Sequence, residues 1–216
     1  MLEKMDEFFN NRLDGYDEHQ LNVIDDAKSF YPFTAKCLPQ TSEAEVLDLG
    51  CGTGLELGYY FNLNSSARIT GIDLSEGMLS ALREKFPNKP ITLLQGSYFD
   101  VPFGNSCYDA VVSVESLHHF TKDEKKPLYE KIRRALKKDG YFILTDYFAS
   151  SEEEEVRCRQ ELNRLRCQQK IEEGVFYHYD TPLTVEHEIE ALLAAGFSSI
   201  KVIGKWGATC TLRAEK

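Results

Sequence analysis

The chain has 216 residues, 42% of them hydrophobic, with 25 Lys and Arg against 35 Asp and Glu. This length and composition are typical of one ordinary globular domain and exclude a disordered or collagen-like chain. The formal net charge of −10 disfavours nucleic acid and anionic membranes as partners, because both are bound by neutralising negative charge. The first residues show no signal-peptide pattern and no run of 18 apolar residues occurs, so a cytoplasmic protein that does not enter a membrane is expected.

Six cysteines are spread along the chain without a C-x-x-C pair and without histidines nearby at zinc-ligand spacing. Reduced thiols with structural roles are therefore expected, and no metal site.

The segment 1–40 is expected to form a helical cap on the domain. Its aromatic residues suit an amphipathic helix packed on a core, whereas Tyr16, within Leu13-Asp-Gly-Tyr-Asp17, is expected in a loop.

Strands and helices are expected to alternate from residue 45 to residue 147. Short apolar runs without polar alternation indicate buried parallel strands at Glu45–Leu49, Arg68–Asp73, Ile91–Leu94, Tyr108–Val114 and Tyr141–Tyr147. Helices are predicted between them at Leu55–Phe61, Ser75–Phe86 and Thr121–Lys138, the last opening with the capping box Thr121-x-x-Glu124.

The segment 149–182 is predicted to be a helical insertion that covers the strand ends as a lid. Ser151-x-x-Glu154 reads as a second capping box, and the glutamates 152–155 are expected to form a solvated first helical turn. The segment ends in an aromatic run, in which His178 and Tyr179 either face a substrate or belong to a strap packed on the sheet edge.

The C-terminal part predicts a helix at Thr184–Ala195 and a hairpin of Phe197–Ile203 with Ala208–Ala214, in which Trp206 is expected to have a packing role. The whole pattern predicts one α/β domain, 1–216, with a doubly wound, mostly parallel seven-stranded sheet and an antiparallel C-terminal hairpin strand. In such sheets, ligands bind beyond the carboxyl ends of the strands.

The segment Val46–Gly54, VLDLGCGTG, runs from an apolar strand into three alternate glycines. Alternate glycines let the backbone approach a ligand closely at the start of a helix. The spacing differs from the dinucleotide fingerprint G-x-G-x-x-G, and Asp48 places a carboxylate where a pyrophosphate site would avoid one. A ligand with a cationic group is therefore favoured.

Polar residues also follow the next strands. Asp73 lies 19 residues beyond Gly54, at the end of the neighbouring strand, where a carboxylate accepts hydrogen bonds from ribose hydroxyls. The third and fourth strands end in Gln95–Asp100 and Val114–His119, which completes a row of polar strand ends.

These motifs together resemble those of the class I S-adenosylmethionine-dependent methyltransferases of the small bacterial type, with a Rossmann-like fold. They are VLDLGCGTG, GIDLS, QGSYFDVPF, YDAVVSVESLHHF and LKKDGYFILTDY, in that order, over about half of the chain. The resemblance implies that the protein binds S-adenosyl-L-methionine, releases S-adenosyl-L-homocysteine and transfers a methyl group to a small-molecule acceptor.

The resemblance also implies roles for particular residues. Asp48 and the backbone of Gly50, Cys51 and Gly52 would hold the methionine part of the cofactor, and Asp73 the ribose. The remaining cofactor contacts would come from Leu74 and Met78 on the adenine, Ser97 and the amide of Tyr98 at the adenine amino group, Val114 and Glu115 beside the methionine, and Tyr16 closing over the cofactor.

Methyl transfer mainly requires a nucleophile and a methyl group held about 3 Å apart in a dry site, so a dedicated catalytic residue is optional. The acid–base candidates are Glu115, His118, His119, Tyr147 and His178.

Three other functions remain open. A non-catalytic cofactor-binding module would bind the same nucleotide without transferring a methyl group. A nicotinamide-dependent oxidoreductase is disfavoured by the glycine spacing. Methylation of a protein or RNA would depend on the cluster of Arg157, Arg159, Arg164 and Arg166, which is interleaved with acidic residues. The acceptor, the methylated atom and the oligomeric state cannot be read from the sequence.

Overall fold

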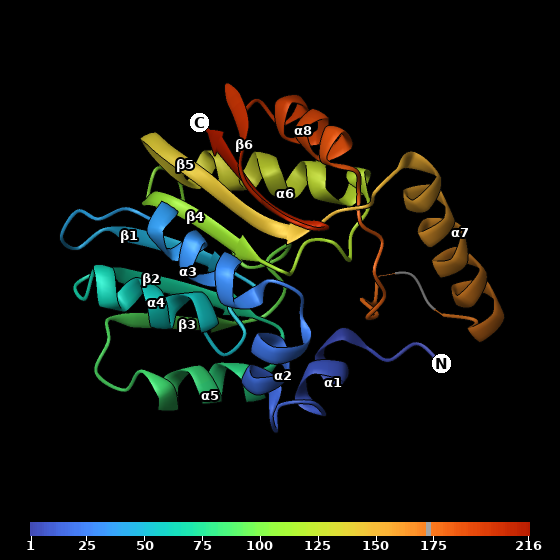
Figure 1. The fold of residues 1–216 in the computed structure, drawn as a ribbon, viewed down its shortest axis with the longest axis horizontal. Coiled ribbons are helices and arrows are strands. Elements are labelled where there is room, and N and C mark those ends of the chain that lie inside the picture. Colours follow the sequence, from blue (N-terminus) through green and yellow to red (C-terminus); the bar gives the residue numbers. More distant parts are fainter. Residues whose placement is uncertain (172–173) are drawn as a thin grey trace.

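The computed structural model describes residues 1–171 and 174–216, and its centre is a seven-stranded sheet in the order β3-β2-β1-β4-β5-β7-β6 (Figure 1). The strands are β1 (Glu45–Leu49), β2 (Arg68–Asp73), β3 (Ile91–Gln95), β4 (Tyr108–Val114), β5 (Leu136–Tyr147), β6 (Ser199–Trp206) and β7 (Thr209–Glu215). The helices are α1 (Met5–Asn10), α2 (Tyr16–Val23), α3 (Ala27–Cys37), α4 (Leu55–Leu63), α5 (Glu76–Lys85), α6 (Lys122–Ala135), α7 (Glu152–Gln169) and α8 (Val185–Ala194).

The sheet confirms the predicted fold class. The neighbouring pairs among β1 to β5 are parallel, and β7 lies antiparallel between β5 and β6. The strand order reverses between β1 and β4, so the crevice at the carboxyl ends of these two strands is the place where a doubly wound sheet binds its ligand.

Helices cover both faces of the sheet (Figure 1). One apolar cluster joins α3 and α4 to the sheet through buried side chains such as Phe30, Leu57 and Tyr60. The other includes Ile132 of α6 and Leu192 of α8. Burying both faces explains why the strands read as continuous apolar runs rather than as alternating ones.

Helix α6 ends three residues before the predicted Lys138. The chain turns at Leu136, which is fully buried and pairs with Tyr108 of β4. The amides of Ser106 and Cys107 donate hydrogen bonds to the carbonyls of Arg134 and Ala135, at 2.9 and 2.7 Å. These bonds satisfy carbonyl groups left free at the helix end, so tertiary pairing stops the helix.

The predicted solvated start of α7 is wrong at Glu155. This side chain is buried, and its carboxylate accepts hydrogen bonds from the Thr184 amide at 2.9 Å and lies 2.8 Å from Nδ1 of His187. The capping box is also only half formed, because Ser151 accepts the amide of Glu154 whereas the Glu154 carboxylate accepts from Ser150. The start of α7 is thus tied to α8.

The segment 1–40 forms α1, α2 and α3, and Tyr16 is the first residue of α2 rather than part of a loop. Gly15, with φ +73°, is the residue before this helix. Asn10 fixes α1 on α5, since its Oδ1 accepts from the Ser75 hydroxyl at 2.7 Å and the Gly77 amide at 3.1 Å.

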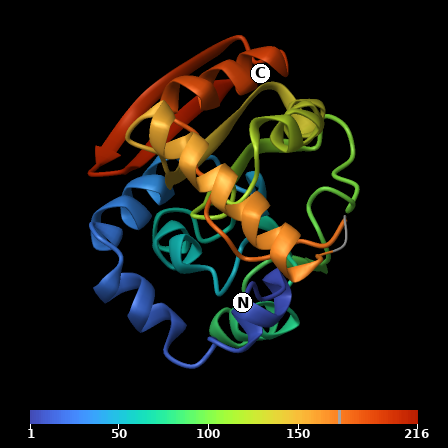
Figure 2. The same ribbon diagram turned by 90° about the vertical axis from the view of Figure 1, so that its right-hand side faces the viewer.

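The end of the predicted lid, 149–182, packs both on the N-terminal segment and on the turns after β3 and β4, where Phe176 contacts Phe99 and Phe120; residues 172 and 173 of this lid lie outside the described residues. Met5 donates its amide to the Phe176 carbonyl, and His178 donates to the Glu3 carbonyl. We name residues 174–182 the strap. Seen from the strand ends, α7 and the N-terminal helices lie across this edge of the sheet (Figure 2).

In the part of the chain that the structure describes, no helix is both long and apolar enough to span a bilayer. All six cysteines carry free thiols.

Candidate active site

The glycine-rich turn after β1 lies at the reversal of the strand order. Gly50 and Gly52 have φ angles of +71° and +48°, which side chains other than glycine rarely adopt. A Cβ atom on Gly50 would lie 2.1 Å from the Ser116 hydroxyl, whereas one on Gly52 would meet no atom within 4 Å. The turn therefore packs on β4 on one side and opens into free space on the other.

Asp73 connects this turn to the end of β2. Its two carboxylate oxygens accept the amides of Gly52 at 2.9 Å and Ser75 at 2.8 Å. Burial raises the pKa of Asp73, and these amides partly offset the rise. Asp73 is thus both a cofactor-binding candidate and a structural support of the turn.

Asp48 of β1 and Glu56 of α4 form a buried carboxyl pair beneath the turn, with exposed fractions of 1% and 4%. Oδ2 of Asp48 and Oε1 of Glu56 have no hydrogen-bond partner among the described residues. Burial raises the pKa of both groups, and the charge of Glu56 raises that of Asp48 further. Buried acceptors without donors suit a cationic ligand group.

A narrow inner cavity of about 60 Å³ lies next to this turn. It is lined by residues of α1, α2, α5 and the strand ends: Met5, Phe9, Tyr16, Gly50, Gly52, Asp73, Leu74, Met78, Tyr98, Val114, Glu115, Ser116, His119 and Phe120. Burial and then the charges of Asp73, Glu115 and Glu56 raise the pKa of Tyr16, so this phenol lies among several carboxylates.

Three predicted cofactor contacts do not line the inner cavity. The Ser97 hydroxyl accepts the amide of Phe99 at 3.2 Å, within its own turn. The Cys51 side chain packs on β2, so that a Cβ on Gly71 would lie 2.8 Å from its sulfur. Asp48 lies behind the cavity lining, in the buried pair with Glu56.

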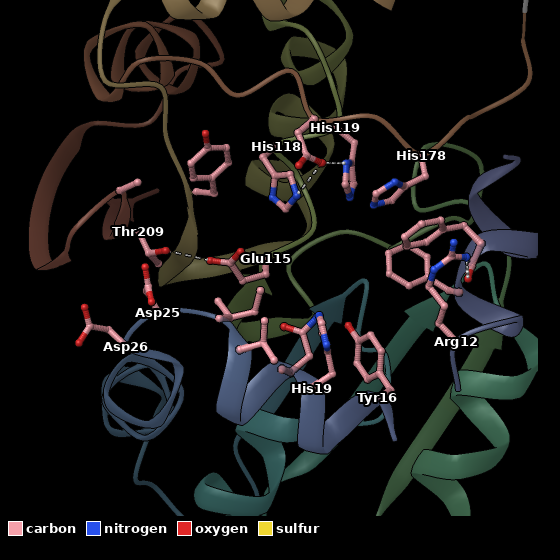
Figure 3. A pocket seen from close by; sticks show the side chains of 18 of the residues that line it. Arg12, Tyr16, His19, Asp25, Asp26, Glu115, His118, His119, His178 and Thr209 are labelled. Atoms are coloured by element: carbon pink, nitrogen blue, oxygen red, sulfur yellow. Dashed lines mark hydrogen bonds and ion pairs between the residues drawn. The ribbon is translucent and has the colours of Figure 1, made fainter. Parts of the chain in front are cut away.

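An outer cavity of about 1080 Å³ adjoins the inner one and shares Phe9, Tyr16, Glu115 and His119 with it. Its wall comes from α1, α2, the end of β4, the strap and the turn between β6 and β7. Figure 3 shows Glu115, His118, His119 and His178 pointing into this space, with Arg12, Tyr16 and His19 on the side of the N-terminal helices.

Glu115 lies where the two cavities meet. It has a φ angle of +50°, a strained conformation of the kind that clusters at functional sites. The Thr209 hydroxyl donates to its carboxylate at 3.3 Å (Figure 3). Burial and then the charge of Asp146 raise the pKa of Glu115 to about 7.

The histidines of the outer cavity differ in charge. Nδ1 of His118 lies 2.5 Å from Oδ1 of Asp146; burial alone would lower the pKa of His118, but the charge of Asp146 raises it to about 9. Burial and the charge of His118 lower the pKa of His119. His178 stacks on Phe8 at 3.5 Å, and its burial lowers its pKa to about 4.

The five acid–base candidates all line the outer cavity, but Tyr179 does not. Tyr179 lines a separate cavity beside Met1 and Leu165. Trp206 borders the outer cavity and packs on Phe33, with ring centroids 5.0 Å apart, so its expected packing role is confirmed.

Sequence reasoning missed the acidic partners of these candidates, namely Glu56, Asp146 and Asp180. Asp180 directly follows the aromatic run of the strap, and this position is the sequence feature that could have indicated it. Asp146 directly precedes the candidate Tyr147.

Comparisons with known proteins agree with this geometry. A family profile described as a methyltransferase domain matches residues 47–144. A fatty-acid O-methyltransferase of Mycolicibacterium smegmatis is 32% identical over 101 residues, which are 47% of this chain and 36% of that protein. The chain thus spans little more than a third of this curated relative.

Two solved structures share the fold. A putative O-methyltransferase of Nostoc punctiforme has a TM-score of 0.72 at 21% identity, covering 99% of this chain and 61% of that one. A possible histamine N-methyltransferase of Thermotoga maritima has a TM-score of 0.68 at 22% identity, covering 98% of this chain and 99% of that one.

Proposed function

Because the chain belongs to the class I S-adenosylmethionine-dependent methyltransferases, we propose that it transfers the methyl group of S-adenosylmethionine to a small molecule. The cofactor would lie along the glycine-rich turn, in the inner cavity and the adjoining part of the outer cavity, and the acceptor in the rest of the outer cavity. The single observation that carries this assignment is the convergence of carboxyl groups on the glycine-rich turn.

Asp73 and Glu115 line the inner cavity, and the buried pair of Asp48 and Glu56 lies directly behind the glycine-rich turn. S-adenosylmethionine carries positive charge on its sulfur and on its α-amino group. Opposite charges attract most strongly where burial lowers the effective dielectric constant. The partner-less oxygens of Asp48 and Glu56 suit the amino group, and Glu115 lies near the place of the sulfonium.

The other contacts follow from the lining. Asp73, at the end of β2, accepts hydrogen bonds from the ribose hydroxyls, while Leu74 and Met78 supply apolar contacts for adenine. Tyr98 takes over the contact expected of Ser97, since Tyr98 lines the cavity and Ser97 does not.

The bound cofactor supplies an electrophilic methyl group. The chain's own residues hold the acceptor in line with it and keep water out, with Phe9 and Tyr16 closing the junction of the two cavities. Of the five acid–base candidates, Glu115 and His119 line both cavities. Glu115 is the proposed base, because its carboxylate faces the junction and accepts a proton from the attacking group.

The acceptor is proposed to be a small molecule with polar and aromatic parts. The outer cavity reaches the upper end of the volumes of small-molecule sites and combines imidazoles with Phe8 and Phe9. Three of the four arginines of α7 are paired with acids, namely Arg157 with Glu154, Arg159 with Glu155 and Arg164 with Glu161, so this cluster does not favour a nucleic-acid acceptor.

Isothermal titration calorimetry with S-adenosylmethionine and S-adenosylhomocysteine tests the proposal. We expect one site per chain, with the product bound at least as tightly. The absence of binding by either compound at about 1 mM would overturn the assignment. Binding without formation of S-adenosylhomocysteine in a broad acceptor screen would instead support the non-catalytic module.

A further inference from the structure

Two imidazoles and one carboxylate meet in the wall of the outer cavity: His118 and His119 after β4, and Asp180 of the strap. We propose that these three side chains bind a divalent first-row transition-metal ion. The cysteine spacing predicted no metal site, and these three groups are brought together only by the fold.

The distances fit a shared metal ion. Oδ1 of Asp180 lies 3.1 Å from Nδ1 of His119 and 3.5 Å from Nε2 of His118. Dashed lines that begin at the labelled His118 and His119 mark these contacts in Figure 3. One ligand atom from each residue lies within 4.8 Å of the others. Two ligands at about 2.1 Å from a metal are roughly 3 to 3.5 Å apart, so small side-chain rotations complete the site.

His119 supplies an independent observation. His119 is 8% exposed, and its Nδ1 makes no hydrogen bond within the described part of the chain. This Nδ1 lies 3.1 Å from Oδ1 of Asp180, within ion-pair distance but outside hydrogen-bond geometry, so the two atoms face each other as two ligands of one metal ion would. A metal ion satisfies both.

A second carboxylate orients the other imidazole. Asp146 contacts Nδ1 of His118 at 2.5 Å, and its own oxygens accept the amides of Leu117 and Tyr147, each at 2.9 Å. Metal-binding histidines typically present their other ring nitrogen to such a carboxylate, which orients the ring, and Nε2 would coordinate the metal on losing its proton. Both Asp146 oxygens accept backbone amides, so we assign Asp146 the role of positioning the His118 ring rather than of binding the metal.

The third ligand is also held in place. The Thr181 amide donates to the His118 carbonyl at 2.8 Å, which anchors the strap directly beside the imidazoles. Both sides of the site are therefore positioned before metal binding, which reduces the ordering cost of binding.

A set of two nitrogens and one oxygen favours zinc or ferrous iron over calcium and magnesium, which prefer oxygen ligands. Because the three side chains line the outer cavity, the remaining coordination positions face the acceptor space. A hydroxyl or carboxylate of the acceptor would bind there. This last step rests on the proposed function, whereas metal binding itself does not.

Metal binding is tested on the full chain, stripped with a chelator and titrated with Co²⁺ alone, without cofactor. The visible absorption of Co²⁺ reports coordination by protein nitrogen. We expect one ion per chain with micromolar or tighter affinity. His119→Ala and Asp180→Asn should each weaken binding by at least about 100-fold, and Asp146→Asn by about 10- to 100-fold.

His19→Ala is the matched control, since His19 is an exposed histidine of the same cavity wall outside the cluster. Its Co²⁺ affinity should equal that of the unaltered chain. Circular dichroism checks that each variant folds. The Asp180 side chain is half exposed, so Asp180→Asn should fold and keeps the test valid even if His119→Ala does not fold. Sub-stoichiometric binding, or equal loss in His19→Ala, would overturn the site.

A separate titration with S-adenosylmethionine keeps the two proposals apart. Cofactor binding without Co²⁺ binding overturns the metal site alone. Co²⁺ binding without cofactor binding supports the metal site and contradicts the proposed function.

Discussion

The inner and outer cavities adjoin but are built differently. The inner cavity is formed mainly by turns that directly follow neighbouring strands, and its polar groups include carboxylates, hydroxyls and one imidazole, that of His119. The outer cavity joins the N-terminal helices, the strap and the C-terminal hairpin, and its polar groups include four histidines. Local sequence determines the first cavity, and long-range packing determines the second.

The electrostatics of the two cavities differ as well. In and behind the lining of the inner cavity, burial raises the pKa of Asp48, Glu56 and Asp73, and a cationic ligand group beside them would stabilise their charged forms. In the outer cavity, the charge of Asp146 raises the pKa of His118 to about 9, whereas burial lowers that of His178 to about 4. The inner cavity thus suits one fixed ligand, and the outer cavity suits proton or metal chemistry.

The largest expected effect is that of Gly52→Val, which should weaken S-adenosylmethionine binding by about 100-fold or more, or ~2.7 kcal/mol. The new side chain projects into the open space beside the turn and adopts an unfavourable positive φ. Calorimetric titration measures the loss. Gly207→Val is the matched control, because Gly207 has φ +55° and equally open space but lies in the turn of the hairpin. Equal losses in both variants would contradict the placement of the cofactor.

The next effect is that of Asp73→Ala. Loss of hydrogen bonds to a charged group should weaken cofactor binding by about 1.5 to 3 kcal/mol, or roughly 10- to 150-fold. The variant should also unfold at a lower temperature, since Asp73 accepts two backbone amides. Calorimetry and thermal unfolding measure the two effects separately.

Asp109→Ala provides the comparison for Asp73→Ala. Asp109 accepts the Glu45 amide at 2.9 Å, so it also connects neighbouring strands, but it does so at the opposite end of β1. It should lower stability without changing cofactor affinity. A loss of affinity in Asp109→Ala as large as that in Asp73→Ala would mean that Asp73 acts only through the fold.

The contrast between the cavities explains what the sequence could predict. Strands β1, β2 and β4 have the predicted bounds, and Gly50, Gly52 and Asp73 line the inner cavity, because glycine freedom and strand ends are local properties. The pairing that ends α6, the burial of Glu155 and the approach of Asp180 to His118 depend on contacts between distant segments. No periodicity or spacing encodes such contacts.

A smaller effect concerns pH and the Asp48–Glu56 pair. Both pKa values are raised, so the pair retains a proton above the ordinary carboxyl range, and a bound amino group must displace it. Affinity for S-adenosylmethionine should therefore increase severalfold as the pH rises through the pKa of the pair, with proton release on binding. Calorimetry in buffers of different ionisation enthalpy measures that proton.

Glu56→Gln sharpens this test, because glutamine fills the same space without titrating. The affinity should become nearly independent of pH and the released proton should disappear. An unchanged pH dependence in Glu56→Gln would place the titrating group elsewhere.

A further prediction concerns Tyr16, where the two cavities meet. The Tyr16 ring lines both cavities, whereas its hydroxyl lies among acids that raise its pKa and keep it protonated. If the ring closes over the cofactor, Tyr16→Ala should weaken binding about 10-fold and Tyr16→Phe only about 2-fold, because most of the contact is apolar area. Equal losses in the two variants, measured by calorimetry, would assign the contribution to the hydroxyl. The N-terminal helices would then belong to the polar cofactor site, and the division between the two cavities would no longer hold.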